Sequence, residues 1–461
     1  MRRTVYLIFF LFICVSCKLN SNDNKFRIYT DTEIVDYNSD IMVNIEDNFD
    51  SNKVDWYVNE KIVSTHDTLV LNSGFEERKL YIYAKSIIDG ESYKSNVCEI
   101  IVTSNSKLFF KLDEFIKKNN ISTPISVGIK NSNYEYFFSS NSLIEGLKHT
   151  KNEEDLYITY SITKSFTTMA VLYLEKSNYF SLGDKITTYI EIPENLFINR
   201  DATIKDLLQH TSGNQDYVKN MSLYYNNPFI NSVWDPNALL RYIQSPPLEI
   251  GTFVYSSTNY ILLGLLIEKV TGKNLNMVFR EFFFDSLSLK NTFLLPQDNV
   301  NMKNILHPHV YPYTDFLLTG DGLSPIDITL IIPNFIIIAG KSSWASGGIV
   351  STARDITNWC HELFNGNILD NELKIDILNS LENNVRDSES IYGYGVRKIF
   401  YKDTSFVGSY GRGLGTVNCM FYNDDTKTSF VILMSSNSSS DGNPNIDELL
   451  FLLYETVTCE A

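Results

Sequence analysis

The stretch YSITKSFT, residues 160–167, places Ser161 three positions before Lys164 at the start of a run with helical spacing. Apolar residues recur at this spacing through residues 161–176, so the segment is predicted to be a helix. Side chains three apart lie on the same helix face, and the Lys164 amine can therefore reach the Ser161 hydroxyl. A serine hydroxyl is a weak nucleophile until a base removes its proton, and a partly buried lysine can act as that base.

This tetrad alone does not separate a nucleophile from a helix cap. Ser104 and Lys107 repeat the spacing in a short linker, where we take the match as chance. A serine that caps a helix, followed by a solvated lysine, has the same pattern. Ser161 is predicted to lie at a helix N-terminus, which supports a catalytic role. Free backbone N–H groups at this end of a helix stabilise negative charge that develops during the reaction.

Three further sequence blocks follow Ser161, at residues 204–213 (IKDLLQHTSG), 251–260 (GTFVYSSTNY) and 346–355 (SGGIVSTARD). With residues 160–167, they resemble four motifs of the serine β-lactamase and penicillin-binding-protein superfamily, in the family's order. The similarity is greatest to the branch of class C β-lactamases, D-Ala-D-Ala carboxypeptidases and related esterases. One short motif is weak support, whereas four in order are specific. The resemblance covers about residues 107–458.

This resemblance implies an α+β fold, with a mostly antiparallel sheet flanked by helices and a helical subdomain inserted after the nucleophile helix. It also implies a serine hydrolase that needs no metal or cofactor. Ser161 would attack an ester or amide carbonyl, Lys164 and Tyr255 would move the protons, and an acyl-enzyme would then be hydrolysed.

The second motif departs from the family pattern of Tyr-x-Asn. Here Tyr255 is retained, but Ser257 stands where the family has asparagine. Serine still offers a donor and an acceptor, although it reaches less far than asparagine. The departure puts recognition of a substrate amide in doubt and leaves the proton relay intact.

The third motif of the family is Lys or His, a small residue, then Gly. An ungapped reading places Ser409 at the cationic position and Gly411 at the glycine. In that frame, the backbone N–H of Arg412 would join that of Ser161 in the oxyanion hole. A frame shifted by three places Arg412 at the cationic position and loses the family's glycine. We prefer the first frame, which counts Ser257, Ser409, Gly411 and Arg412 as substrate-binding positions.

Other catalytic patterns are weak. The chain contains no Gly-x-Ser-x-Gly motif of the α/β-hydrolases. His307 and His309 lack a third ligand at metal-binding spacing, and His361-Glu362 lacks the second histidine of a zinc helix. His210 lies in a block that is structural in the family, so we expect a buried, hydrogen-bonding role for it.

The first 25 residues indicate that the protein is exported from the cytoplasm. Residues 1–16 combine Arg2 and Arg3 with an apolar run, as in a signal peptide, and Cys17 follows in a sequence that resembles the bacterial lipobox. The departure is Cys14, where leucine is usual; a plain cleaved signal is the alternative. Residues 17–25 then form a lipidated cysteine with a polar tether. These features predict a membrane-anchored lipoprotein of the bacterial cell envelope.

Residues 26–104 contain short alternating segments without a helical run, which predicts a β-sandwich. Trp56 alternates with Val54 and Val58, so it is expected in the core. The stretch 56–61 resembles bacterial immunoglobulin-like modules. No catalytic cluster occurs here, so a spacer or binding role is expected. The hydrolase domain is assigned to residues 107–461.

Within that domain, periodicity predicts a hairpin, a helix, three strands and a final helix, at residues 125–138, 259–270, 394–400, 416–422, 429–434 and 445–457. The helix at 259–270 ends at Thr271-Gly272, where glycine is the usual residue just past a helix end. The apolar run 330–339 is interrupted by Pro333 and is predicted to be a buried loop or a cleft wall.

Composition narrows the function further. The 461 residues carry a formal net charge of −16, which disfavours nucleic-acid binding. Six cysteines in this length are too few for a disulfide scaffold, and Cys98, Cys360, Cys419 and Cys459 are expected to be buried thiols. The leading hypothesis is an esterase or D-amino-acid peptidase-like enzyme, acting on a small or peptidoglycan-derived substrate. The alternative is a catalytically weak envelope protein that binds peptidoglycan or a partner.

Overall fold

The chain forms two compact units, Met1–Asp113 and Glu114–Ala461, in the computed structural model. The boundary lies inside α1 (Ser106–Lys118). The structure describes residues 27–30, 34–36, 40–45, 54–64, 68–72, 78–88, 91–103, 106–119, 121–139, 155–220, 234–310, 325–383, 390–436 and 445–458. The predicted signal peptide, Cys17 and the tether lie outside these residues.

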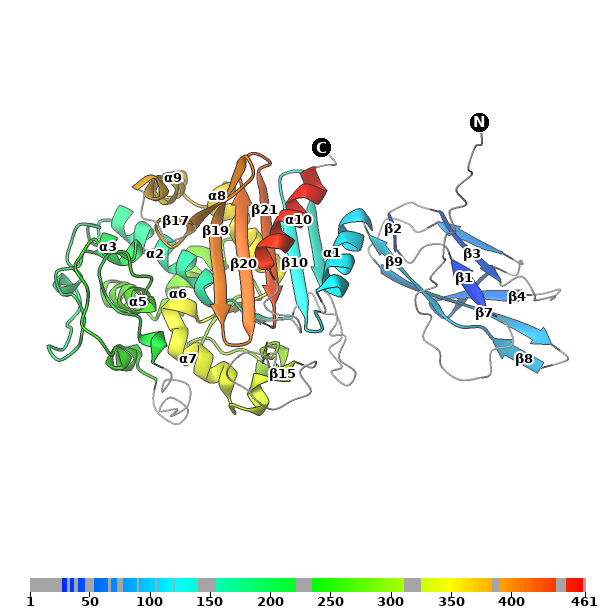
Figure 1. The fold of residues 1–461 in the computed structure, drawn as a ribbon, viewed down its shortest axis with the longest axis horizontal. Helices are drawn as coiled ribbons and strands as arrows, with labels where there is room; N and C mark the ends of the chain where they lie inside the picture. Colours follow the sequence, from blue (N-terminus) through cyan, green and yellow to red (C-terminus); the bar gives the residue numbers. More distant parts are fainter. Residues whose placement is uncertain are drawn as a thin grey trace, which may run out of the picture. The chain divides into compact units, whose positions relative to one another are not determined.

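The first unit contains two β-sheets that share one apolar core (Figure 1). Its described strands are β1 (Ile28–Thr30), β2 (Ile34–Asp36), β3 (Asp40–Ile45), β4 (Val54–Val58), β5 (Lys61–Ser64), β6 (Leu69–Asn72), β7 (Arg78–Ile88), β8 (Glu91–Lys94) and β9 (Cys98–Thr103). One sheet has the order β1-β3-β6; the other has the order β2-β9-β7-β4-β5, with β8 beside β7.

The core of this unit follows from the alternation of apolar residues along its strands. Trp56 and Val54 are buried on the inner face of β4, as predicted, and they join Ile41 of the opposite sheet. The parallel pairing of β2 with β9 is not apparent from the sequence, because β2 is only three residues long.

The second unit is built on a seven-stranded sheet with the order β11-β10-β21-β20-β19-β18-β17. Every pair in it is antiparallel, which confirms the predicted fold class. Its strands are β10 (Ile125–Lys130), β11 (Glu135–Ser139), β17 (Ile391–Tyr392), β18 (Arg397–Tyr401), β19 (Thr404–Gly413), β20 (Thr416–Asn423) and β21 (Thr428–Met434).

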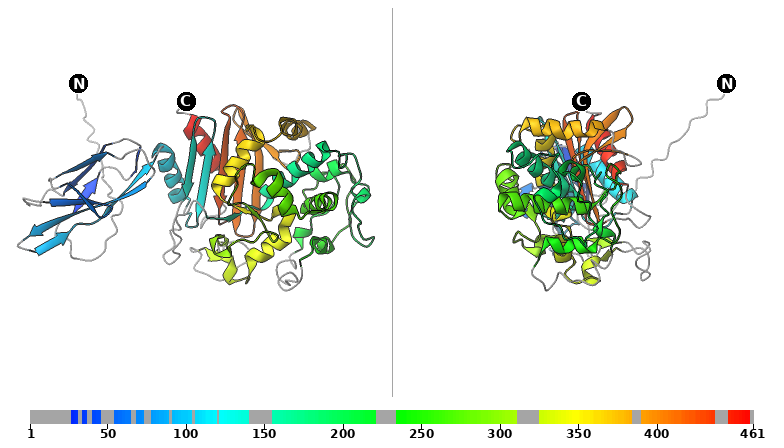
Figure 2. Two further views of the ribbon diagram at one scale, coloured as in Figure 1. Left: turned by 180° about the vertical axis from the view of Figure 1, so that it is seen from behind. Right: turned by 90° about the vertical axis from the view of Figure 1, so that its left-hand side faces the viewer.

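Helices cover both faces of this sheet (Figure 2). On one face α8 (Ala353–Phe364) packs against β10, β20 and β21, and on the other α10 (Ile446–Thr458) packs against β20 and β21. Neighbouring residues of β21 separate the two faces: Val431 joins the core that contains Trp359 of α8, whereas the Phe430 ring meets Tyr454 of α10.

A helical region inserted between β11 and β17 carries the four sequence blocks described above. Its helices are α2 (Thr163–Lys176), α3 (Ile204–Leu208), α5 (Ser257–Thr271), α6 (Leu275–Phe279) and α7 (Phe335–Gly347), and α9 (Asn371–Ser380) follows α8. Short strands β12 (Tyr157–Ile158), β13 (Phe293–Leu294) and β16 (Ile349–Ser351) form a small sheet beside them, and β14 (His309–Val310) pairs with β15 (Ile326–Asp327). Short 3-10 turns and one π-turn connect these elements.

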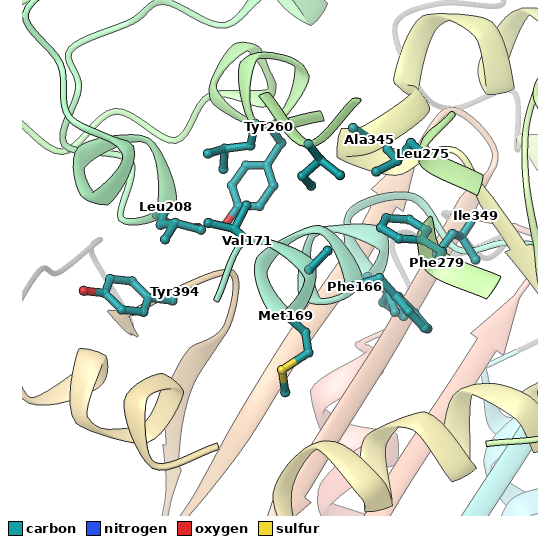
Figure 3. Close-up of a cluster of buried hydrophobic side chains, with 14 of the residues drawn as sticks. Phe166, Met169, Val171, Leu208, Tyr260, Leu275, Phe279, Ala345, Ile349 and Tyr394 are labelled. Atoms are coloured by element: carbon teal, nitrogen blue, oxygen red, sulfur yellow. The ribbon is translucent and has the colours of Figure 1, made fainter. Parts of the chain in front are cut away.

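The nucleophile helix α2 lies at the centre of the large core (Figure 3). The Phe166 ring stacks on Trp359 of α8 with 3.9 Å between centroids, and it also meets Phe279 of α6. Packing on nearly every side fixes the position of α2, and with it the residues at its N-terminal end.

Most predicted elements of this unit are present, with one correction. The final helix, the hairpin and the helix that ends before Gly272 are confirmed, and Gly272 has φ 66°. The predicted loop at 330–339 was wrong over its second half. Asn334 begins the helix α7, whose buried apolar residues pack against α2 and α5.

No described helix is long and apolar enough to cross a bilayer.

Candidate active site

Ser161 sits in a 3-10 turn, Tyr160–Ile162, that leads directly into α2. The preceding Tyr160 has φ 43°, a left-handed conformation that non-glycine residues rarely adopt. Glycines allow neighbouring segments to approach this turn. A Cβ on Gly413 would lie 2.2 Å from the Tyr160 ring, and one on Gly347 would lie 3.4 Å from the Tyr160 backbone. The strained turn is therefore held from two sides by strand β19 and helix α7.

Lys164 points back at Ser161 from the first turn of α2. Its Nζ lies 2.9 Å from Ser161 Oγ and donates a second hydrogen bond of 2.8 Å to the Ser346 carbonyl oxygen at the end of α7. The side chain is 1% exposed. The amine is thus fixed beside the hydroxyl by two elements far apart in the sequence, an arrangement suited to proton transfer.

Tyr255 lies beside the same amine. Lys164 Nζ is 5.2 Å from the Tyr255 ring centroid and 5.5 Å from that of Tyr260. The structure therefore brings Ser161, Lys164 and Tyr255 into one site.

The His210 ring packs against the Tyr255 ring. Its ring is fully buried, with its centroid 4.4 Å from that of Tyr255. Nδ1 accepts a hydrogen bond of 3.1 Å from the Ser256 N–H, so the ring proton is on Nε2, 3.2 Å from the Tyr392 hydroxyl. Burial, with Lys164 and Arg397 adding to it, holds the pKa of His210 well below its usual range. The expected buried, hydrogen-bonding role is confirmed.

Ser257 begins helix α5 two residues after Tyr255 and is buried. Its backbone N–H donates a hydrogen bond of 3.1 Å to Asp216 Oδ1. Burial raises the pKa of the Asp216 carboxyl, and the positive charge of Lys164 opposes that shift. The second motif therefore has an acidic neighbour that the sequence patterns did not single out.

The residues of β19 alternate between two environments. A Cβ on Gly411 would lie 1.9 Å from the Thr159 carbonyl oxygen, so Gly411 and Ser409 belong to the face toward the nucleophile turn. Arg412 belongs to the other face, where its guanidinium lies 4.9 Å from the Tyr410 ring centroid. The Arg412 side chain thus points away from Ser161, and Ser409 is the residue of this pair on the nucleophile side.

A second arginine approaches from the neighbouring strand. The Arg397 guanidinium of β18 lies 5.3 Å from the Tyr410 ring centroid and 5.6 Å from that of Tyr392. The Tyr410 hydroxyl donates to Asp447 of α10. The Arg397 guanidinium therefore lies near two aromatic rings, and its Nη1 donates a hydrogen bond of 3.3 Å to Ser390 Oγ.

Several residues near the site lie outside the predicted set. The Tyr217 hydroxyl donates to the Ser342 carbonyl and lies 3.4 Å from Ser346 Oγ, next to the carbonyl that binds Lys164. Asp216 and Tyr217 lie three and four residues after the end of the block 204–213, and Ser346 begins the block 346–355. Their closeness to a recognised motif was the only feature of the sequence that could have pointed to Asp216 and Tyr217 as residues near the site.

The histidines at 307 and 309 and the cysteines were also considered in the sequence, as weak metal ligands and as buried thiols. His307 Nδ1 lies 2.7 Å from Asp327 Oδ2, and no group of three potential ligands that could hold a metal occurs in the described ranges. Cys98, Cys360 and Cys419 are buried, as expected, and form no disulfide with one another, whereas Cys459 is not among the described residues.

Known proteins are similar to this chain in fold and, at low identity, in sequence. The beta-lactamase family model matches residues 146–454, more than half of the chain. D-amino acid amidase from Ochrobactrum anthropi SV3, complexed with L-phenylalanine amide, superimposes with a TM-score of 0.63 at 19% identity, covering 77% of this chain and 99% of that one. A penicillin-binding protein from Bacillus halodurans gives 0.58 at 16% identity, covering 76% of this chain and all of that one.

Two curated relatives have enzyme names. Teichoic acid D-alanine hydrolase of Staphylococcus aureus is 19% identical over 381 residues, which are 81% of this chain and 85% of that protein. Unguisins hydrolase ungD of Aspergillus violaceofuscus is 24% identical over 220 residues, which are 46% of this chain and only 36% of that protein. The family match over residues 146–454, together with the Ser161–Lys164 geometry, leads to one conclusion: the chain belongs to the beta-lactamase family of serine hydrolases.

Proposed function

We propose that the protein hydrolyses a small ester or amide through an acyl-enzyme on Ser161. The observation that carries this proposal is the Lys164 amine, which is buried, 2.9 Å from Ser161 Oγ and held by the Ser346 carbonyl. A solvated lysine after a capping serine would have none of these restraints. The proposal also draws on the family to which the chain belongs.

In the first step, Ser161 Oγ attacks the substrate carbonyl carbon while its proton moves to the Lys164 amine. The carbonyl oxygen becomes an oxyanion, for which the backbone N–H groups of Ser161 and Arg412 are the proposed donors. The tetrahedral intermediate then expels the leaving group, which takes up the proton relayed by Lys164 and Tyr255. This gives an ester on Ser161 and the free alcohol or amine.

In the second step, water attacks the acyl-enzyme carbonyl and gives up a proton to the same pair, Lys164 and Tyr255. Collapse of the new intermediate returns the proton to Ser161 Oγ and releases the acid. His210, which packs on Tyr255, stays neutral because burial lowers its pKa, and it keeps the tyrosine ring in place.

The altered motifs favour esters and aminoacyl compounds over β-lactams. Ser257 and Ser409 replace the amide and the cation with which relatives bind a substrate amide and carboxylate. Substrates that lack these two groups lose least by the replacement. Teichoic acid D-alanine hydrolase and D-amino acid amidase are similar proteins whose names describe a D-alanine compound and a D-amino acid amide, and neither name describes a β-lactam.

A turnover assay tests this proposal. We expect wild type to hydrolyse 4-nitrophenyl butyrate and the Ser161→Ala variant to fall to the rate of buffer. Ser165→Ala is the matched control, because Ser165 is buried on the same helix and bonds to the Ile162 carbonyl instead. Hydrolysis that survives in Ser161→Ala would exclude Ser161 as the nucleophile. A wild type inactive on esters, D-Ala-D-Ala peptides and β-lactams would favour the alternative of an envelope binding protein.

We also propose that Cys17 anchors the mature chain to a membrane in the cell envelope. The motif that supports this proposal is the lipobox-like sequence at residues 14–17. Cys17→Ser should move the protein from the membrane to the soluble fraction, whereas Cys98→Ser should not. Membrane retention of Cys17→Ser would contradict the anchor.

A further inference from the structure

Helix α7 is interrupted near its end by Trp344, whose backbone is not helical. Its angles are φ 33° and ψ −119°. They resemble those of the first central residue of a type II′ turn, roughly +60° and −120°, a position that glycine normally occupies. A residue with a side chain keeps such a conformation only where the surrounding structure enforces it, and such residues are concentrated at functional sites. The kink at Trp344 therefore points to a role for the segment that follows it.

The indole of Trp344 holds this kink by packing. The side chain is fully buried, and its ring meets Trp234 edge-on with 5.3 Å between centroids. Helix α5 approaches at Gly264, where a Cβ would lie 2.8 Å from the indole and 2.5 Å from the Ala345 Cβ. The indole N–H has no hydrogen-bond partner within the described part of the chain. Contact with the neighbouring ring and helix therefore fixes the position of Trp344.

The part of α7 before the kink, residues 335–343, is anchored by two aromatic side chains. The Lys341 carbonyl accepts a hydrogen bond of 3.1 Å from Trp234 Nε1, and the Ser342 carbonyl accepts one from the Tyr217 hydroxyl. Both donors come from segments that lie before α7 in the sequence. The helix therefore enters the kink at a fixed position.

After the kink, the last turn of α7 directs two carbonyl groups at the nucleophile helix. The Ala345 carbonyl accepts a hydrogen bond of 2.7 Å from Thr167 Oγ1, and the Ser346 carbonyl accepts the 2.8 Å bond from Lys164 Nζ. Both donors belong to α2. In an uninterrupted helix, carbonyl groups point along the helix axis and are not directed sideways at a neighbouring helix. The change of direction at residue 344 therefore makes these two contacts possible.

We infer that Trp344 is a positioning residue for Lys164. Its left-handed backbone, held by the packed indole, directs the Ser346 carbonyl at the Lys164 amine and so keeps that amine beside Ser161 Oγ. This inference rests on the proposed function and adds to it a residue outside the four sequence blocks.

A purely structural role in the core is the competing explanation, because loss of a buried tryptophan destabilises a protein in any case. Two substitutions separate the roles. Trp344→Ala and Trp344→Gly remove the same indole, and they differ in how well the backbone tolerates a positive φ. Glycine adopts that conformation at no steric cost, whereas alanine is strained in it.

The test measures the rate at which a fluorophosphonate labels Ser161, together with kcat and KM for 4-nitrophenyl butyrate. Each rate is normalised to the folded fraction of the variant. We expect Trp344→Ala to react about tenfold more slowly than Trp344→Gly, since only the glycine variant keeps the turn without the indole. The difference should lie in kcat, with KM values within about threefold of each other, because Lys164 acts on the chemical step.

Trp359 supplies the matched control. It is also a buried tryptophan, but it lies in the regular helix α8, where glycine is less favourable than alanine. Trp359→Gly should therefore react no faster than Trp359→Ala, the opposite order to that at position 344. A Trp344→Ala variant as reactive as Trp344→Gly, or the same order at both positions, would overturn the inference and leave the serine hydrolase standing.

A second variant keeps the indole and displaces the kink. Gly264→Ala suits a helix better than glycine, but its added methyl group would press on Trp344 and Ala345. We expect this overpacking to slow labelling of Ser161 by about tenfold. Gly183→Ala is the control and should react like wild type, since its Cβ would lie 3.8 Å from the nearest atom beyond its chain neighbours.

The second variant decides the question if both position-344 variants fail to fold. Wild-type reactivity of Gly264→Ala would then overturn the inference, and a loss in kcat without a change in KM would support it. A wild type that is neither labelled nor active on the ester would overturn the proposed function, and this inference with it.

Discussion

The two halves of the candidate site differ in how closely they follow the family. The half that moves protons retains Ser161, Lys164 and Tyr255, and its lysine is fixed between two helices. The half that binds the substrate has serine at both positions 257 and 409. We therefore expect the family's chemistry to be kept and the choice of substrate to differ.

Burial reinforces this contrast. Lys164 is 1% exposed, and Tyr255 is backed by the buried His210. Changes in the proton-transfer half should therefore affect kcat with every substrate. Changes in the substrate-binding half should affect the choice between substrates.

The largest effect is expected at Lys164. Lys164→Met removes the base but keeps an apolar chain of similar length, so kcat should fall by about 10²–10⁴-fold, the usual contribution of general-base catalysis. Lys176→Met is the control on the same helix, because Lys176 is half-exposed and pairs with Asp370 and Glu372. Steady-state kinetics on the best ester, with circular dichroism to confirm folding, checks this. Comparable losses in both variants would contradict the role of Lys164.

A somewhat smaller effect is expected at Tyr255. Tyr255→Phe keeps the ring that packs on His210 and removes only the hydroxyl, so kcat should fall by about 10²-fold or more with little change in KM. The pH profile of kcat should change as well. Tyr242→Phe is the control, since Tyr242 lies on a different element, the 3-10 turn Pro236–Tyr242. A loss confined to KM would place Tyr255 in the substrate-binding half instead.

The double variant Ser257→Asn/Ser409→His restores the family's groups in the substrate-binding half. Acylation of Ser161 by benzylpenicillin should become about tenfold faster or more, because electrostatic elements of such sites contribute two or more orders of magnitude in related chemistry. Hydrolysis of a neutral ester should stay within about threefold. Stopped-flow acylation rates check this, with Ser405→Asn as a control on β19. An unchanged penicillin rate would show that these two positions do not determine substrate choice.

The smallest effect concerns pH and stability. Burial lowers the pKa of His210, so the unfolded state binds a proton below about pH 6.5 that the folded state does not. The free energy of unfolding should therefore lose up to about 1.4 kcal/mol per pH unit as pH falls below that value. His210→Asn should remove this contribution. Urea denaturation between pH 7 and 5 measures the difference in slope; parallel slopes would contradict a neutral His210.

Much of the fold was predictable because its elements are long and periodic. The Ser161 helix, the helix before Gly272 and strands β10, β11, β20 and β21 of the main sheet follow from hydrophobic spacing and helix-stop signals, whereas β17 and β19 were not predicted. Helix α7 was not predicted, because Pro333 and Asn334 interrupt an apolar run that has no polar face. It packs among other helices on nearly all sides, so its sequence lacks an amphipathic pattern.

Only part of the site could be predicted, because sequence motifs identify some of its residues and the fold brings in the others. Residues inside recognised motifs, such as Ser161 and Tyr255, could be located by their spacing. Asp216, Tyr217 and Tyr392 take part through contacts that the fold creates, and their positions in the sequence do not reveal those contacts. The direction of the Arg412 side chain likewise depends on strand alternation within the assembled sheet.

The most direct test of the central claim is covalent labelling of the full chain with a fluorophosphonate, followed by intact-mass measurement and peptide mapping. We expect one adduct per wild-type chain, located on Ser161. Ser161→Ala should show none, and Ser165→Ala should be labelled like wild type. An adduct of equal yield on Ser161→Ala, or one mapped to another residue, would contradict the assignment of Ser161 as the nucleophile.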